Sequence, residues 1–359
     1  MEKIEEKHRH IGTVGKKTLI IKKNRQKMQV RRRLFMLEEN YPIRTDLALE
    51  TQERIGHGNG AIKGVDFSEN KLENGITIST VRILTRNAEK TMGRPRGYYI
   101  TIEAPDMIDN DEGYHREISV ELAKIIRKLL PDIKREPEEE ISALVVGLGN
   151  REVTPDALGP RVIDNMFITR HIIKEYGKYA FGDERVNKIS GIVPGVMAQT
   201  GMECLEIVRG VVKETHPDFV ITVDALAARN AKRLCRTIQL TDTGITPGSG
   251  IGNHRHALNQ ESVGIPVISL GVPTVVDAAT IVNDTMYNLI AAMNQSKALG
   301  TLTDSLESLD EAEKYELIRE LLSPNLNAMF VTPKDIDESI KRLSFTISEG
   351  INIAFSPQE

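Results

Sequence analysis

Three short runs of apolar, largely β-branched residues constrain the fold of this chain more than any other feature. They cover residues 143–146, 219–223 and 265–270, and each is followed by a polar loop and then by a helical pattern. Unbroken apolar strands that alternate with helices are typical of strands buried on both faces of a parallel sheet. The sequence therefore predicts an α/β fold with a largely parallel sheet and flanking helices.

An antiparallel element is predicted before this part of the chain. Residues 76–84 and 98–103 alternate apolar and polar side chains, and the segment 94–97 between them has the composition of a turn. This alternation predicts two antiparallel strands at a sheet edge. Apolar residues at helical spacing over 115–130 predict a helix that Pro131 ends.

Composition limits the class of protein. The chain has 359 residues, of which 40% are hydrophobic and 27% charged, so it is long enough to bury a sizeable core. It contains no run of about 18 apolar residues and no apolar signal core, so we expect a cytoplasmic protein without membrane contact. Cys204 and Cys235 lie far apart and outside any CxxC spacing, which disfavours a disulfide framework and a structural zinc site.

The charge is divided unevenly along the chain. Residues 1–36 hold twelve Lys and Arg against three Glu, whereas the rest is acidic. Such a leader can contact the phosphates of nucleic acid, but no recognition helix or interleaved aromatic residues accompany it, so a solvated tail is the favoured interpretation. A start of translation at Met36, directly after the basic run, remains an alternative.

Two acidic residues follow the first two apolar runs. Asp156 lies in the loop after the first run, near a predicted helix N-terminus, and Asp224 directly follows the second run. The C-terminal ends of parallel strands form the crevice in which ligands bind, so the two carboxylates are expected at one edge of the sheet. The structural alternatives are a helix cap for Asp156 and an ion pair with Arg229 for Asp224.

The remaining polar loops suggest other roles. After the third run, Thr274 and Asp277 have the spacing of a capping box, and we interpret Asp277 as a helix cap. The glycine-dense segment 242–253 offers backbone amides to an extended peptide or an oxyanion. It matches neither a dinucleotide fingerprint nor a P-loop. Its candidate substrate-binding residues are Gly248, Ser249, Gly250 and Gly252.

Templates for other hydrolases are absent from the sequence. It contains no HExxH motif and no GxSxG motif around Ser249. His254 and His256 form an i, i+2 pair that is more typical of a polar surface turn than of a metal site. We therefore expect neither a metal ion nor a cofactor, and the carboxylate pair is the remaining candidate for catalysis.

Several blocks of sequence resemble the spore germination proteases of endospore-forming bacteria, over a likeness that runs from about residue 43 to residue 337. They are GLGN at 147–150, TPDALGP at 154–160, PGVM at 194–197, PDFVITVDALAAR at 217–229, DTGITPGSGIGN at 242–253 and IPVISLGVPTVVDAATI at 265–281. That family is similar in fold to the hydrogenase-maturation endopeptidases, which share the arrangement of a strand, GxGN and a loop with Asp.

The resemblance implies an endopeptidase that degrades small acid-soluble spore proteins during germination. It implies a homotetramer in the forespore and spore core, made as a zymogen that loses an N-terminal propeptide. The family's atypical aspartic-peptidase assignment carries over to Asp156 and Asp224. Two departures are Arg151-Glu152, where the family has an aromatic and a neutral residue, and a leader before Tyr41 that is longer and more basic than a usual propeptide.

Two neighbouring carboxylates can share one proton, so that one activates water while the other polarises the scissile carbonyl or protonates the leaving amine. The sequence leaves their individual roles open. One alternative is a nickel-sensing maturation endopeptidase, which would need a histidine ligand where the chain has Gly271, Val272 and Pro273. Another is a noncatalytic DNA-associated spore protein, which would leave both acids and the glycine loop without a role.

Residues 45–50, TDLALE, resemble the family's substrate pattern, in which cleavage follows an acidic residue and precedes an apolar one, with a second acid downstream. This likeness predicts self-cleavage between Asp46 and Leu47. The chain would then divide into a basic leader and propeptide, 1–46, and a protease domain, 47–359. The alternative is that residues 43–50 form a stable first segment of the domain.

Overall fold

The computed structural model describes residues 45–59, 62–108, 111–130, 140–182, 186–248, 255–282, 285 and 329–356. Nearly all of them belong to one compact unit made of residues 44–281 and 328–359. The basic leader lies outside the described residues, and so do Ser249, Gly250, Gly252 and His254. None of the helices in these ranges combines the length and the apolar character that crossing a membrane requires.

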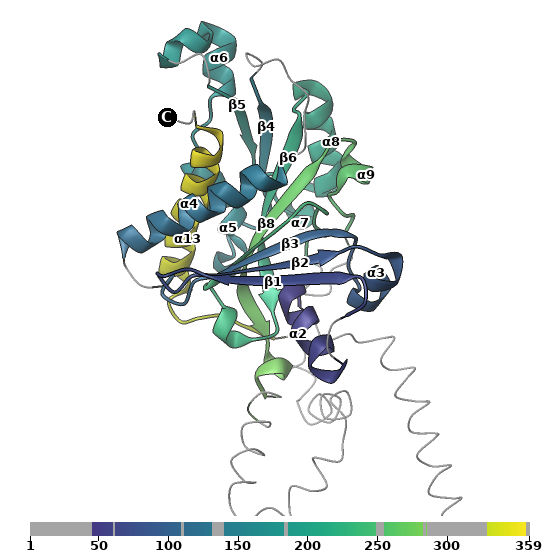
Figure 1. The fold of residues 1–359 in the computed structure, drawn as a ribbon. Helices are drawn as coiled ribbons and strands as arrows, with labels where there is room; N and C mark the ends of the chain where they lie inside the picture. The colour runs from purple at the N-terminus through teal and green to yellow at the C-terminus, as the bar shows by residue number, and fades with distance from the viewer. Residues whose placement is uncertain are drawn as a thin grey trace, which may run out of the picture. The chain divides into compact units, whose positions relative to one another are not determined.

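Within the described ranges the strands form one nine-stranded mixed sheet in the order β1-β2-β3-β7-β8-β6-β4-β5, with β9 paired to β8 (Figure 1). The strands are β1 (Val65–Lys71), β2 (Thr77–Ile83), β3 (Gly97–Glu103), β4 (Ser142–Gly147), β5 (Lys188–Ile192), β6 (Phe219–Ala228), β7 (Thr237–Thr241), β8 (Val267–Asp277) and β9 (Phe330–Val331).

The sheet changes direction at β8. Strands β5, β4, β6 and β8 pair in parallel, whereas β8, β7, β3, β2 and β1 pair antiparallel. The prediction of an α/β fold with an N-terminal antiparallel element is therefore confirmed, but the prediction of a largely parallel sheet is wrong. The segment between β6 and β7 is only eight residues long, too short for a helical crossover, so β7 returns antiparallel to β6 and joins the N-terminal strands.

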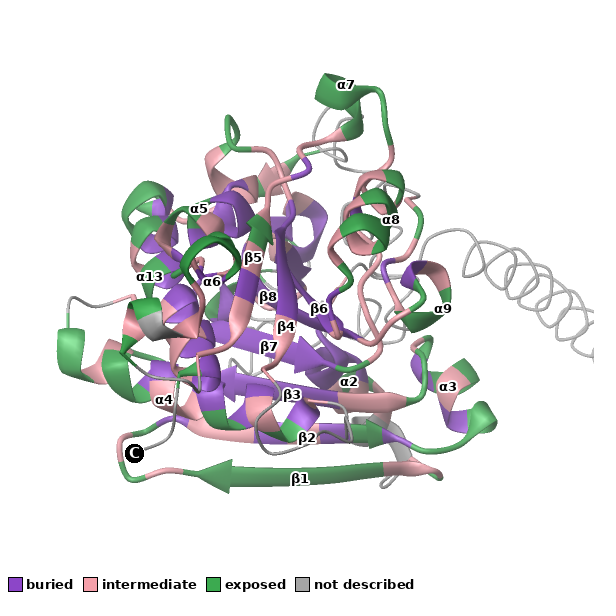
Figure 2. Cartoon of the chain, turned by 90° about the horizontal axis from the view of Figure 1, so that it is seen from above, coloured by how far each residue is buried: buried purple, intermediate pink, exposed green. Residues whose placement is uncertain are grey.

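The predicted strand pair 76–84 and 98–103 corresponds to β2 and β3, which pair antiparallel. It does not form the edge of the sheet, because β1 lies outside it and pairs with β2. Most residues of β1 are exposed and polar, as Figure 2 shows, so the strand has no apolar alternation to reveal it. Between β2 and β3 the chain also forms a short helix, α3 (Arg86–Met92), before the predicted turn.

The first two apolar runs lie in β4 and β6, and the third lies in β8 from Val267 onward, but β6 and β8 continue further than predicted. Asp224 therefore lies within β6, and Asp277 is the last residue of β8. Asp277 Oδ1 accepts the Ala279 N–H at 2.8 Å where a helical segment begins, which confirms its capping role. Thr274 is buried inside β8, so the predicted capping box is wrong.

Helices cover both faces of the sheet (Figure 2). Helices α4, α5 and α13 pack on one face, and α8 and α9 lie on the other. The described helices are α2 (Ala48–Asn59), α3, α4 (Glu112–Leu129), α5 (Leu158–Asn165), α6 (Arg170–Tyr176), α7 (Met197–Thr200), α8 (Cys204–Thr215), α9 (Gln260–Val263) and α13 (Ile336–Phe355). Helix α4 confirms the helix predicted over 115–130, with Asp111 as its N-cap.

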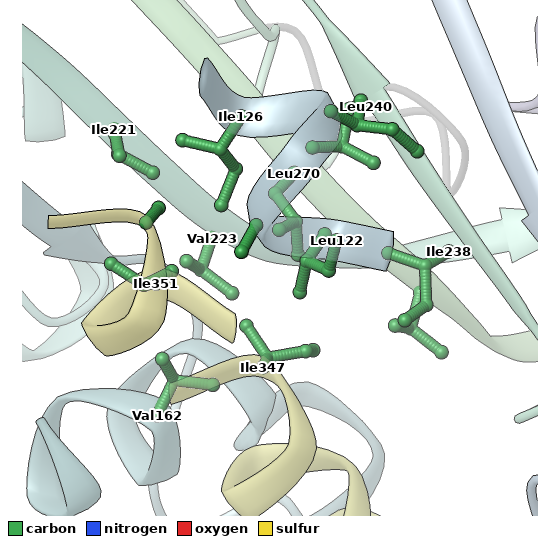
Figure 3. Packing of buried hydrophobic residues seen from close by; sticks show 14 of the residues in the cluster. Leu122, Ile126, Val162, Ile221, Val223, Ile238, Leu240, Leu270, Ile347 and Ile351 are labelled. Carbon is green, nitrogen blue, oxygen red and sulfur yellow. The ribbon is translucent and has the colours of Figure 1, made fainter. Parts of the chain in front are cut away.

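The largest hydrophobic core lies between the sheet and the face of α4 and α13. Leu122 and Ile126 from α4 meet Ile347 and Ile351 from α13 over Val223 of β6 (Figure 3). All five side chains are fully buried. Because side chains alternate along a strand, the neighbours of Val223 in β6 point to the opposite face, and this places Asp224 away from the core.

Candidate active site

A row of polar side chains crosses the sheet on the face opposite α4 and α13. Ser79, Thr101, Gln239, Gly271 and Asp224 are register partners across β2, β3, β7, β8 and β6. The four side chains of this row are at most 6% exposed. Register partners point to the same face of a sheet, so the row places a buried carboxyl and a buried amide on one surface.

Asp224 is the buried carboxyl of this row. Only 4% of the residue is exposed, and its Oδ1 accepts the N–H of Ala225 at 2.9 Å. Burial holds the pKa of Asp224 well above its ordinary value, and the carboxylates of Asp156 and Asp46 raise it further. Arg229, the predicted structural partner, is not among the groups that shift this pKa.

Asp156 reaches the same region from the loop after β4. It ends the short 3-10 helix Thr154–Asp156, and its Oδ2 accepts the Asn150 N–H at 2.7 Å. The carboxylate therefore turns back toward the β4 loop rather than capping α5, whose N-cap is Ala157. Burial raises the pKa of Asp156, and the hydrogen bond from Asn150 acts in the opposite direction.

Gly149 allows the β4 loop to fold this tightly. Its φ is +110°, and a Cβ at this position would lie 2.0 Å from the carbonyl oxygen of Asp156. Only glycine fits both requirements. The GLGN block thus sets the position of Asp156 through its backbone.

Asp156 and Asp224 line one cavity of about 90 Å³, together with Cys204, Gly248 and Arg255 among others. Asp224 and Gly248 also line a larger cavity of about 280 Å³. The structure therefore brings together the two predicted acids and the one predicted glycine of the loop 242–253 that it describes. The predicted surface residue His256 is exposed and lines the smaller cavity.

The chain's own segment before α2 lies against the larger cavity. Asp46 donates its N–H to the Ala227 carbonyl at 2.9 Å, and its Oδ2 accepts the Ala227 N–H at 2.8 Å. Arg94 Nη2 donates to the Thr45 carbonyl at 2.8 Å, and Leu47 is fully buried. Asp46 and Asp224 both line this cavity, so the predicted cleavage site and one predicted catalytic acid share it.

Glu50, the second acid of the substrate-like sequence 45–50, lies in the first turn of α2 and is also held by specific contacts. Its carboxylate accepts the backbone N–H groups of Arg229 and Asn230 at 2.8 and 2.9 Å, and it lies 3.5 Å from the guanidinium of Arg233. The side chain of Glu50 is 3% exposed. The residues that follow β6 thus form a binding site for a carboxylate, four residues beyond the Asp46–Leu47 bond.

Sequence reasoning missed Gln239, Arg94 and Cys204 as residues of these cavities. Gln239 lies in β7, a five-residue strand that was not predicted, and its only signal is the alternation of Thr, Ile, Gln, Leu and Thr over 237–241. Burial, and then the charge of Asp224, raise the pKa of the Cys204 thiol. This thiol is therefore not activated as a nucleophile.

In the part of the chain that the structure describes, no three His, Cys, Asp or Glu side chains are grouped as a metal ion would require. At the third strand, Gly271, Val272 and Pro273 continue β8 and offer no imidazole.

Gly159 holds the backbone beside both acids. A Cβ at this position would lie 2.3 and 2.4 Å from the carbonyl oxygens of Leu148 and Val223, which precede the β4 loop and Asp224. We expect Gly159→Ala to lower the free energy of unfolding by about 1–3 kcal/mol, as overpacking does, and to reduce activity. Chemical denaturation measures the first effect.

The matched control is Gly210→Ala in the middle of α8, where an added Cβ meets nothing within 4 Å. This variant should gain up to about 1 kcal/mol from helix propensity. Equal stabilities of the two variants would show that the packing at Gly159 is not tight.

Known proteins resemble this chain over most of its length. The family model described as germination protease matches residues 44–300 and 292–358. A germination protease of Caldanaerobacter subterraneus subsp. tengcongensis is 48% identical over 88% of this chain and 94% of its own length. Germination proteases of Clostridium perfringens and Bacillus velezensis are 45% and 40% identical over 88% and 87% of this chain, and over 96% and 93% of their own.

Proposed function

Because this chain belongs to the germination protease family, it is a peptidase with a role in spore germination, and we propose that it cleaves small acid-soluble spore proteins with Asp156 and Asp224 as its catalytic carboxylates. The observation that carries the proposal is the pair itself. Two carboxyl groups, one from the loop after β4 and one from β6, line one cavity, and burial raises the pKa of both. Such a pair titrates as a unit and retains one proton to higher pH than an isolated aspartate does.

We assign the shared proton to Asp224 and the negative charge to Asp156. Asp224 is the more deeply buried acid, and two other carboxylates disfavour its ionisation. Asp156 accepts the Asn150 N–H, which favours the charged form. In this assignment Asp156 takes a proton from the attacking water, and Asp224 protonates the departing amine.

A preference for acidic residues in the substrate is supported by the contacts that hold Asp46, which lines the larger cavity, and Glu50. The Ala227 N–H and the guanidinium of Arg94 lie beside Asp46, and backbone N–H groups with Arg233 bind Glu50. A substrate with an acid before the scissile bond and another four residues after it would match both positions. This is the pattern expected of the family's substrates.

The same contacts support autoprocessing. They hold Asp46 at the edge of the cavity that Asp224 lines, which supports the proposal that the chain acts as its own tethered substrate. Tethering gives the bond a high effective concentration. We propose a zymogen that loses residues 1–46 and leaves 47–359 as the protease domain, working as a homotetramer in the forespore and spore core.

Incubation of the purified protein with a small acid-soluble spore protein tests the function. We expect endoproteolysis that continues in EDTA and in the presence of serine and thiol reagents, because the pair needs neither a metal nor an activated nucleophile. Mass spectrometry of the products should find an acidic residue before each cleaved bond.

Cys204→Ala is the control for the thiol reagents, because Cys204 lines the cavity and any loss of activity caused by a reagent attached to this side chain would be absent in the variant. The variant should cleave at the rate of the wild type. Loss of activity in EDTA that nickel or zinc restores would instead favour the metal-dependent maturation endopeptidase.

A further inference from the structure

The side-chain amide of Gln239 forms hydrogen bonds with backbone groups on both sides of Leu47. Its Nε2 donates to the carbonyl oxygen of Asp46 at 2.9 Å, and its Oε1 accepts the N–H of Ala48 at 2.7 Å. The two contacts require opposite ends of the amide, so they fix which end faces the carbonyl. One neutral side chain thus holds the peptide bond before Leu47 and the one after it.

Gln239 lies in the same row as the proposed acid Asp224. Both residues are register partners of Gly271, from the two strands that flank β8. Their Cα atoms are therefore about two strand spacings apart, or about 10 Å. Their side chains share one face of the sheet, and both line the larger cavity with Asp46. An amide and a carboxyl can thus approach one peptide bond from neighbouring positions.

We propose that Gln239 is a catalytic residue whose Nε2–H stabilises the oxyanion that forms at the scissile carbonyl. The inference rests on the proposed function, since it takes Asp46–Leu47 as the model of a cleaved bond. Attack by water on the scissile carbonyl carbon forms a C–O bond, and one proton of the water passes to the ionised Asp156. The carbonyl oxygen then carries the negative charge, which the amide N–H binds more strongly than the neutral carbonyl. Collapse of the tetrahedral intermediate breaks the C–N bond, and Asp224 gives its proton to the departing amine.

Burial strengthens this contact. Gln239 is 6% exposed, so little water competes for the carbonyl oxygen. The second contact, from Ala48 N–H to Oε1, prevents the amide from rotating away. A donor that is held in place before the charge develops needs no reorganisation during the reaction.

Gln239→Leu and Gln239→Glu test the proposal on the processed protein with a synthetic peptide of residues 43–52. We expect kcat to fall about 10²–10³-fold in Gln239→Leu, as for loss of one oxyanion donor, with a much smaller change in KM. Gln239→Glu should be equally slow at neutral pH and should regain activity relative to the wild type at the same pH as the pH falls, because a protonated carboxyl again donates to the oxyanion. A purely structural glutamine would show no such recovery.

Thr101→Val is the matched control. Thr101 is the register neighbour of Gln239 on the same face, and its buried hydroxyl has no hydrogen-bond partner among the described residues. This variant should retain the kcat of the wild type, and circular dichroism verifies that all three variants fold.

The outcomes separate the two proposals. A wild-type protein that cleaves neither the peptide nor a small acid-soluble spore protein would overturn the proposed function and this inference together. An active wild type with kcat preserved in folded Gln239→Leu, or with only KM raised, would overturn the inference alone. The same holds if Gln239→Glu folds but shows no recovery at acidic pH.

Discussion

Asn in place of Asp224 or Asp156 is expected to reduce peptide cleavage by about 10²–10⁴-fold, the contribution of general acid or base catalysis. An amide has the volume of the carboxyl group but cannot exchange the proton. Both acids line one cavity. In either variant the remaining acid therefore lacks the second carboxyl group of the pair. The rate of cleavage of a small acid-soluble spore protein by each purified variant measures the effect.

Asp66→Asn is the control for this comparison, because Asp66 lies exposed on the edge strand β1. It should cleave at the rate of the wild type. A folded Asp156→Asn or Asp224→Asn variant that retains the wild-type rate would remove that acid from the mechanism.

The free energy of unfolding of Asp224→Asn shows whether this variant folds. The direction of its change relative to the wild type follows from the pKa of Asp224. The pKa of Asp224 is higher in the folded than in the unfolded protein. At pH values between the ordinary aspartate pKa, about 4, and the pKa of Asp224 in the folded protein, the native state binds more protons than the unfolded state. The stability of the wild type therefore falls as the pH rises through this range. Asp224→Asn avoids that loss, so it should be more stable than the wild type at neutral pH and lose this advantage near pH 4.

The two acids were predictable because their signal is local. Asp224 interrupts an apolar run, and Asp156 follows a glycine turn, so each marks the C-terminal region of a strand in the printed sequence. Asp224 lies at the predicted site although β6 continues beyond it, because the position of its side chain on the sheet depends on the register between β6 and β8 and not on where β6 ends.

Strand direction and the role of Gln239 were not predictable in the same way. A strand of five residues with Thr and Gln on one face resembles a polar loop, and nothing local encodes whether its neighbour runs parallel or antiparallel. Gln239 becomes significant only through its contacts with Asp46 and Ala48, which are more than 190 residues away. The largely parallel sheet was wrong for the same reason, since β7 reverses the direction of pairing at β8.

Self-cleavage at the Asp46–Leu47 bond would determine the first residue of the mature chain. After processing, N-terminal sequencing should find Leu47 as the first residue, and Asp46→Lys should slow self-processing about 10–100-fold. Asp46 Oδ2 accepts the Ala227 N–H. Burial lowers the pKa of the Arg94 guanidinium, and the nearby negative charge of Asp46 partly offsets this effect. A lysine cannot accept this hydrogen bond and brings a second positive charge toward Arg94. Loss of a hydrogen bond to a charged group amounts to about 1.5–3 kcal/mol, which corresponds to that change in rate.

Two interpretations of this segment predict different results. If residues 43–50 are only a stable first segment of the domain, an interpretation that agrees with the burial of Leu47, Ala48 and Leu49, then a fully active protein should retain Arg44, Thr45 and Asp46. That result would exclude self-cleavage at this bond. Asp46→Glu is the matched control, because it keeps the carboxylate and should still be processed. Mildly acidic incubation should accelerate the wild type: the carboxylates of Asp156 and Asp46 both disfavour the negative charge of Asp224, and protonation relieves that repulsion. An Asp46→Lys variant whose processing is as fast as that of the wild type would show that the acid before the bond is not recognised.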